Sequence, residues 1–155
     1  MSLPAPVSSR LQLQHEAIHD LLNGFSEEQL KQRIQKDKWS AFEQLAHLTS
    51  YQPVFLQRLL LIEQGDNPLF DRYVADNDPA FTECCKKSLD ELLNSLVTQR
   101  EIIYNHLMTL SGASLNKTGR HPKYGVLTIP EWTEFFLLHE AHHLFGIFML
   151  TRAAR

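Results

Sequence analysis

The sequence lacks most of the features that identify the commoner classes of protein. Only two of its 155 residues are cysteines, Cys84 and Cys85, and adjacent cysteines rarely form a disulfide with each other. No run of lysine or arginine is present and the net charge is −3, so we expect no nucleic-acid partner. No apolar run is long enough to cross a membrane, and the N-terminal residues lack the apolar core of a signal peptide. These absences predict a reduced, cytoplasmic protein with no membrane partner.

What the chain does contain indicates a single helical domain. Its length fits one domain, which we expect to span residues 1–155, and a hydrophobic content of 43% is typical of globular proteins. Four long stretches carry the period of an α-helix, and no stretch carries a strand pattern that competes with them. Eight histidines are a high number for this length. The sequence therefore predicts an all-α fold.

The expected helices are bounded by glycines and by two loops. We place them at about residues 9–23, with a short charged turn of helix at 26–35, and then at 40–64, 79–111 and 131–150. Ser40 with Glu43, and Thr128 with Glu131, have the spacing of capping boxes at helix starts. The loop at 65–79 is long enough to return the chain to the same end of a bundle, which would make the second and third helices parallel.

The last of these helices is apolar nearly all round, which is typical of a buried helix, yet it contains His139, Glu140, His142 and His143. Imidazole rings buried without partners are costly. His139 and His143 are four residues apart, so they lie on one face at a spacing that suits two ligands of one metal ion. Hydrogen-bonded core or surface histidines are the alternative, but two at this spacing in so apolar a segment favour a metal.

The same residues also spell His-Glu-x-x-His, the motif of zincin proteases, and Gly146 extends it toward the metzincin form. The third metzincin ligand would fall at Met149, which is no zinc ligand of that family. Only twelve residues follow His143, too few for the downstream ligand of the other zincins. A third ligand must therefore come from upstream.

Other polar residues are candidates for the same site. On the second helix Glu43, His47 and Tyr51 recur every four residues and form one polar stripe, which can also be a solvated face. His15 points inward from the first helix, where a core hydrogen bond is a better interpretation than ligation. Arg100 interrupts the apolar seam of the third helix, so it needs a carboxylate partner such as Glu43 or, less simply, an anionic substrate.

Both long loops hold residues that can cover a site. The loop at 65–79 contains Phe70, Arg72 and Tyr73, for which packing on the bundle is an equally good interpretation. The loop at 112–127 carries a basic patch of four residues, Lys117, Arg120, His121 and Lys123.

Three segments, taken in order, resemble the DinB-like (DinB/YfiT) superfamily. They are Trp39–Leu48 (WSAFEQLAHL), His121–Thr128 (HPKYGVLT) and His139–His143 (HEAHH), and the resemblance covers nearly the whole chain. It implies a four-helix bundle with up-down-down-up topology. It also implies one divalent metal ion, often nickel or zinc, held by one histidine of the second helix and two of the fourth. By position these are His47, His139 and His143, and His47 is the upstream ligand that the protease motif lacks.

Three histidines leave a coordination position open, as catalytic zinc sites do. Members of the superfamily include thiol-dependent S-transferases and an isomerase that uses a low-molecular-weight thiol. The resemblance therefore implies a metal that activates a thiol or water against a small-molecule substrate. Two alternatives stay open: a hydrolase with Glu140 or Glu43 as base, and a non-catalytic bundle that binds metal or a partner. Tyr51, Arg100 and His121 are the candidate substrate contacts.

The last helix has two apolar stripes with different expected partners. The stripe of Phe136, His139 and His143 faces the interior, so we expect His143 to be the ligand, with His142 and His15 at most supporting the site. The second stripe consists of Phe135, Leu138, His142, Phe145 and Met149. It either completes a contact within the bundle or packs on a second subunit. Because relatives are often homodimers, we expect a two-fold homodimer.

Overall fold

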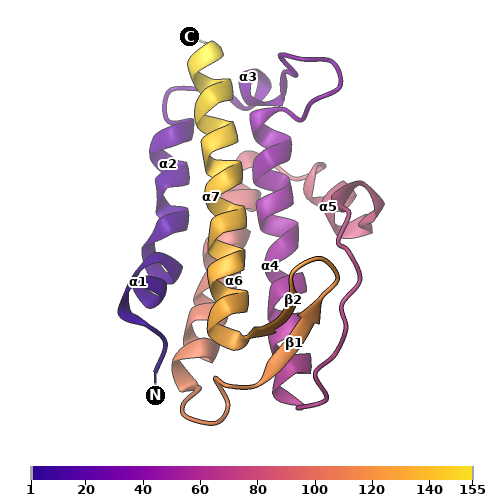
Figure 1. Ribbon diagram of the computed structural model, residues 1–155. Helices are drawn as coiled ribbons and strands as arrows, with labels where there is room; N and C mark the ends of the chain where they lie inside the picture. Colours follow the sequence, from indigo (N-terminus) through magenta and orange to yellow (C-terminus); the bar gives the residue numbers. More distant parts are fainter. Residues whose placement is uncertain (1, 155) are drawn as a thin grey trace.

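A computed structural model describes residues 2–154 as four long helical segments with a small hairpin at one end (Figure 1). The helical elements are α1 (Ala5–Leu13), η1 (Gln14–Glu16), α2 (Ala17–Leu22), α3 (Glu27–Lys31), α4 (Ala41–Glu63), η2 (Ala75–Asn77), α5 (Pro79–Cys84), α6 (Leu89–Thr109) and α7 (Ile129–Ala153). The strands are β1 (Thr118–His121) and β2 (Gly125–Thr128). No helix in this part of the chain has the length and apolarity that a membrane crossing requires.

The four long segments follow an up-down-down-up order. In Figure 1, α1 and α2 rise from the N-terminus, α4 descends, and the segment after α4 returns along the outside of the bundle. As a result α6 descends parallel to α4, and α7 rises to the C-terminus. Helix α4 packs against both α6 and α7, and α1 packs against the same two helices from the other side. The predicted four-helix bundle and its topology are confirmed.

Local sequence explains where the two site-bearing helices begin. The Ser40 hydroxyl accepts a hydrogen bond from the Glu43 N–H, and the Glu43 carboxylate accepts one from the Ser40 N–H. Thr128 and Glu131 make the same reciprocal pair at the start of α7. Each pair satisfies backbone donors that have no partner inside the helix. Both predicted capping boxes are present.

Two expectations about secondary structure are wrong. The helix expected at 79–111 is two helices, because Ser88 makes a capping box with Glu91 and starts α6 after a short turn. The stretch at 112–127, expected to be without strands, contains β1 and β2, which pair antiparallel with Thr118 opposite Thr128 and His121 opposite Gly125. The first helix also includes the 3-10 turn η1 between α1 and α2.

The core consists of two apolar clusters with a buried polar layer between them. One cluster, at the hairpin end, includes Phe55, Trp132 and Phe136. The other, at the α3 end, includes Phe42 and Leu96. Each of the four long segments has buried polar side chains at the level where the two clusters meet. They are His15 on the first segment, residues between His47 and Gln52 on α4, Arg100 on α6 and Glu140 on α7. Tyr51 lies at the same level of α4. Five of the candidate residues, His15, His47, Tyr51, Arg100 and Glu140, lie in this layer.

Candidate metal centre

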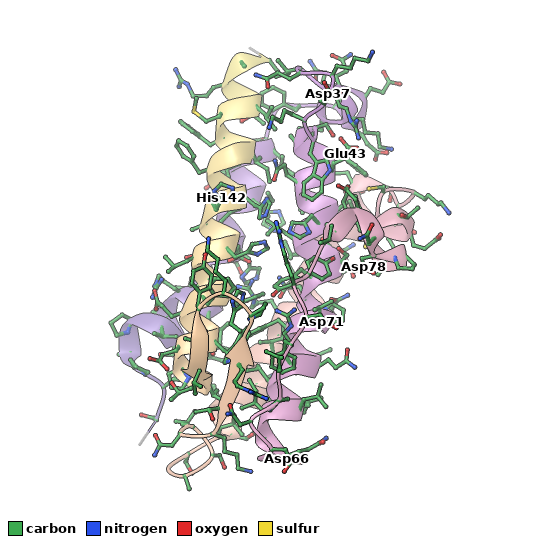
Figure 2. The ribbon with its side chains drawn as sticks, turned by 45° about the vertical axis from the view of Figure 1, so that its right-hand side comes forward. Asp37, Glu43, Asp66, Asp71, Asp78 and His142 are labelled. Atoms are coloured by element: carbon green, nitrogen blue, oxygen red, sulfur yellow. The ribbon has the colours of Figure 1, made fainter. Side chains whose placement is uncertain are left out.

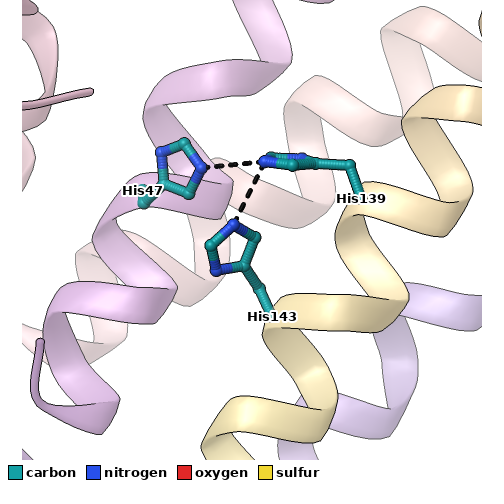
Figure 3. A group of neighbouring side chains, drawn as sticks. All are labelled: His47, His139 and His143. Atoms are coloured by element: carbon teal, nitrogen blue, oxygen red, sulfur yellow. Dashed lines mark hydrogen bonds between the residues drawn. The ribbon is translucent and has the colours of Figure 1, made fainter. Parts of the chain in front are cut away.

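Helices α4 and α7 bring three histidines together in the polar layer (Figure 3). His47 comes from α4, and His139 and His143 come from successive turns of α7, which is antiparallel to it. The Nε2 atom of His139 lies 3.1 Å from Nε2 of His47 and 3.1 Å from Nε2 of His143. One ligand atom from each ring lies within 4.8 Å of the other two. The structure thus groups the same three residues that the family resemblance implies.

No placement of the ring protons gives both His139 contacts a good hydrogen bond unless a cation lies among the three rings. The Nδ1 atom of His143 contacts the amide oxygen of Gln44, an acceptor, so His143 carries its proton on Nδ1 and turns an unprotonated Nε2 inward. His139 Nε2 holds one proton or none, so it cannot make good hydrogen bonds to both neighbouring Nε2 atoms. A divalent ion among three unprotonated Nε2 atoms resolves the conflict, because imidazole nitrogen is a preferred ligand of zinc, nickel and copper.

The surroundings keep the three rings in the form that binds metal. Burial, followed by the neighbouring histidines, lowers the pKa of His47, His139 and His143 from the ordinary value to about 3 each. The rings are therefore neutral near pH 7. The Nδ1 atoms of His47 and His139 are buried without a hydrogen-bond partner among residues 2–154, and such atoms are uncommon outside functional sites.

Aromatic rings enclose the cluster on several sides. Trp39, just before α4, lies 5.1 Å from the His47 ring and 6.2 Å from the His143 ring, measured between centroids. The Tyr51 ring lies 4.9 Å from the His139 ring, and Tyr73 stacks on His47 at 5.9 Å. Their apolar surfaces lower the local polarity, which strengthens electrostatic interactions within the site.

A cavity of about 470 Å³ opens beside His139. Helix α4 contributes Tyr51 and Arg58 to its lining. The segment after α4, the hairpin turn and α7 contribute the rest: Arg72, Tyr73, His121, Pro122, Lys123, Tyr124, Phe135 and His139. Both loops whose roles the sequence leaves open therefore contribute to this cavity. A smaller cavity of about 250 Å³ lies between α3 and the end of α7, and none of the residues among 2–154 that line it has an ionisable side chain.

Two of the predicted substrate contacts, Tyr51 and His121, lie in the cavity wall. The Nδ1 atom of His121 accepts hydrogen bonds from the backbone N–H groups of Lys123 and Tyr124, both at 3.1 Å. The ring proton is therefore assigned to Nε2. Burial and then the positive charges of Arg58 and Lys123 lower the pKa of His121. His121 is thus a neutral ring with one N–H to donate.

Arg100 and Glu140 lie outside the cavity. They form an ion pair with each other, and each side chain is 1% exposed. Arg100 also donates to the Leu11 carbonyl and to the Gln52 side-chain oxygen, both at 3.2 Å. Arg100 therefore has the carboxylate partner that its burial requires, although that partner is Glu140 rather than Glu43. The arrangement argues against a substrate contact for Arg100 and against a general base at Glu140.

The remaining candidates lie around the cluster without joining it. Glu43 is bound by Arg33 and by its capping box, toward the end of the bundle near Asp37 (Figure 2), which argues against a role as base. His142 is exposed on α7 with its ring 5.3 Å from that of His143. His15 is buried, and its Nδ1 accepts a hydrogen bond from Arg100 at 3.4 Å. This is the expected core hydrogen bond, made with an arginine instead of a carbonyl.

Residues 10–145 match the sequence profile of the DinB superfamily. The chain belongs to this superfamily. Its fold is similar to that of YfiT from Bacillus subtilis, with a TM-score of 0.81 and 16% identity over 96% of this chain and 85% of that one. YfiT is described as a probable metal-dependent hydrolase with an unusual four-helix bundle topology. An uncharacterised protein from Clostridium difficile 630 aligns with a TM-score of 0.66 and 16% identity, over 95% and 92% of the two chains. Comparison with curated proteins gave no match.

In this DinB-superfamily chain, sequence reasoning missed two residues of the site. Gln44 orients His143, and the only sequence signal is its position three residues before His47 on α4. Arg58 lines the cavity, and it follows His47 and Tyr51 along the same helix at intervals of four and seven residues. That spacing puts all three side chains on one face, so the stripe of polar residues on α4 extends further than expected.

Proposed function

We propose that this chain is a metal-dependent enzyme that acts on a small molecule. One divalent ion, zinc or nickel, would be held by Nε2 of His47, His139 and His143. The observation that carries the proposal is the convergence of three neutral imidazoles beside a cavity large enough for a substrate. Three protein ligands are typical of catalytic zinc sites, whereas structural sites are closed by four.

A bound divalent ion supplies a Lewis acid that lowers the pKa of a water or thiol beside it. The chain's own residues would bind the substrate, orient the metal ligands and shield the site from water. Gln44 fixes the tautomer and direction of the His143 ring. Burial raises the pKa of Tyr51, so its hydroxyl stays protonated and, together with His121, offers hydrogen-bond donors to a substrate.

Two nucleophiles are compatible with this site, and each has its own support. A low-molecular-weight thiol, giving an S-transferase-like reaction, is favoured by the lining of the cavity, which contains no carboxylate to serve as a general base. A thiol ionises more readily than water and depends less on such a base. Water, giving hydrolysis, is supported by the description of YfiT as a probable metal-dependent hydrolase. We propose that either reaction takes place in the cytoplasm, where Cys84 and Cys85 stay reduced.

Metal analysis followed by two activity assays tests the proposal. Chelator-treated protein is titrated with zinc, nickel, cobalt and manganese by calorimetry, and we expect one ion per chain. The loaded protein is then given chlorodinitrobenzene with a low-molecular-weight thiol, and p-nitrophenyl acetate without thiol, with His139→Ala as the control. Thiol consumption identifies a transferase and ester cleavage a hydrolase. Metal binding without turnover would favour a non-catalytic bundle, and failure to bind any of the four ions would overturn the proposal.

A further inference from the structure

Arg58 is a buried cation without a carboxylate partner. It is 9% exposed, and among residues 2–154 its side chain donates hydrogen bonds to neutral acceptors, the Tyr51 hydroxyl and the Asp71 carbonyl, both at 3.1 Å. No ion pair in residues 2–154 involves it. Arg100, which is 1% exposed, does have a carboxylate partner, Glu140. An unpaired charge in a protein interior is costly, so the lack of compensation at Arg58 needs a reason.

Aromatic rings compensate the charge only in part. The guanidinium carbon lies 5.9 Å from the Tyr51 ring centroid, 5.3 Å from that of Phe70 and 5.6 Å from that of Trp132. Such contacts stabilise a cation by about 0.5–2 kcal/mol each, and they leave the charge free to bind an anion. The guanidinium is therefore held in place by neutral groups.

The position of Arg58 places this charge within reach of the histidines. Helical side chains point back toward the N-terminus of their helix, so Arg58 extends toward Tyr51, and Tyr51 in turn contacts His139. A single tyrosine ring separates the guanidinium from a proposed metal ligand. Arg58 and His139 line the same cavity, so one small molecule can contact both ends.

Two further cations share the cavity with Arg58. Arg72 and Lys123 line it, and none of the described residues of its lining is acidic. Asp71 and Asp78 lie near it in Figure 2, in a neighbouring groove that Arg58 and Arg72 also line, but the Asp78 carboxylate accepts a hydrogen bond from Tyr73 and Asp71 meets Arg58 through its backbone carbonyl. The charged side chains of the described cavity lining are therefore all cations.

We propose that Arg58 is the anion-binding residue of this cavity and that the substrate joins an oxyanion, a carboxylate or a phosphate, to an apolar body. The body packs on the rings of Tyr51, Tyr73, Tyr124 and Phe135, which share the cavity with the arginine. A planar guanidinium suits both oxyanions because it can donate two parallel hydrogen bonds. The assignment of this molecule as a substrate rests on the proposed function, whereas its binding at Arg58 does not.

Three matched probes test the inference: benzoate, phenyl phosphate and benzamide, which is neutral and close to benzoate in shape. Their affinities for the full chain are measured by ligand-observed saturation-transfer NMR, first without metal, so that an anion cannot gain from coordination. We expect wild type to prefer at least one anion to benzamide by about tenfold, since a hydrogen bond to a charged group is worth about 1.5–3 kcal/mol. The tighter of the two anions identifies the group as carboxylate or phosphate.

Variants then assign the preference to Arg58. Arg58→Gln should bring the anion and amide affinities together, and Arg58→Lys should retain part of the difference. Arg152→Gln removes an exposed arginine at the far end of α7 and should leave it unchanged. If Arg58→Gln does not fold, Lys123→Gln at the exposed hairpin turn gives a second measurement, with an expected loss of up to about fivefold. Equal binding of all three probes to wild type, or an anion preference that survives Arg58→Gln, would overturn the inference. If Arg58→Gln does not fold, an unchanged preference in Lys123→Gln would overturn it.

Zinc titration of the same variants keeps the two proposals apart. Arg58→Gln should bind zinc with the stoichiometry of wild type, because Arg58 makes no contact with an Nε2 atom of the cluster. A protein that binds no metal but loses its anion preference in Arg58→Gln would refute the proposed function and support the anion site. A protein that binds metal and has no anion preference would support the metal-binding part of the proposed function and refute the anion site.

Discussion

Arg100 of α6 and Glu140 of α7 form an ion pair that is almost completely enclosed, with each side chain 1% exposed. Glu140 directly follows His139, yet the two side chains serve different neighbours. Consecutive helical residues point about 100° apart, so His139 meets His47 of α4 while Glu140 meets Arg100 of α6. One turn of α7 therefore contains both a proposed metal ligand, His139, and one partner of the buried ion pair, Glu140.

The first prediction is that Glu140→Ala destabilises the fold. Removing one partner leaves Arg100 buried without compensation, which costs about 3–5 kcal/mol. Urea unfolding of the metal-free protein measures the loss. Glu134→Ala is the matched control, because its pair with Arg10 lies at the surface and should contribute less than about 1 kcal/mol. Unchanged stability together with abolished turnover would instead make Glu140 a catalytic base.

The second prediction separates His142 from His143. Because His143 turns its Nε2 toward His139 while His142 is exposed, His143→Ala, His139→Ala and His47→Ala should each nearly abolish zinc binding. His142→Ala should keep most of the affinity. Calorimetric titration of zinc into the four variants tests which of the two histidines is the ligand. Loss of zinc in His142→Ala with retention in His143→Ala would show that the orientation of α7 is wrong.

Much of the fold was predictable because helical period and capping act over short distances. The pairs Ser40 with Glu43 and Thr128 with Glu131 locate the starts of α4 and α7 from sequence alone. The start of α6 could have been predicted in the same way, since Ser88 and Glu91 have the same spacing. The hairpin could not, because each strand has only four residues and its turn lacks the Asn-Gly or Asp-Gly signal of tight hairpins.

Residues of the site could be predicted from the sequence only where they belong to a recognisable motif. Histidine spacing indicates two ligands on one helix, but only the family resemblance selected His47 from upstream. The partner of Arg100 and the burial of Arg58 without a carboxylate depend on which segments pack together, and no local pattern carries that information. Glu140 shows the limit clearly, since its place between two histidines favoured a catalytic role that tertiary packing argues against.

The third prediction concerns the pH dependence of stability. Burial lowers the pKa of His15 to about 4, so the folded state binds fewer protons than the unfolded state at pH values between about 4 and 6.5. Stability is therefore full above pH 6.5 and is lost as the pH falls toward 4. His15 alone should cost about 2 kcal/mol between pH 7 and pH 5.

Urea unfolding of metal-free protein at these two pH values tests this dependence. In His15→Gln the difference between the two values should shrink by about 2 kcal/mol. His19→Gln removes an exposed histidine that also helps to lower the pKa of His15, after burial and Arg100, so it should reduce the difference by less than His15→Gln does. An equal pH dependence in wild type and His15→Gln would contradict the prediction. The three clustered histidines act in the same direction, because burial lowers their pKa values as well.

The fourth prediction is a two-fold homodimer. Leu138, Phe145 and Met149 are 56%, 63% and 53% exposed, so these three side chains of the stripe lie largely at the surface, whereas Phe135 packs on His121. We propose that the exposed stripe packs on the same stripe of a second copy, since apolar rows of this kind commonly mark interfaces. Light scattering at tens of micromolar should give the mass of a dimer, and Phe145→Lys should give a monomer. Ile102→Lys, at an exposed apolar position of α6, is the control. A monomeric wild type would refute this assembly.

The fifth prediction is that Gln44 positions His143 for metal binding. Its amide oxygen accepts the Nδ1 proton of His143 and so directs the Nε2 lone pair toward the other two rings. Gln44→Leu should weaken zinc binding by about 10–100-fold, the usual effect of losing a hydrogen-bond partner of a ligand. Gln44→Glu keeps an acceptor and should retain the affinity, which a merely structural role would not predict. Gln57→Leu, at an exposed position of the same helix, should bind zinc like wild type. Calorimetry on the three variants tests the role, and an unchanged affinity in Gln44→Leu would show that α7 orients His143 without help.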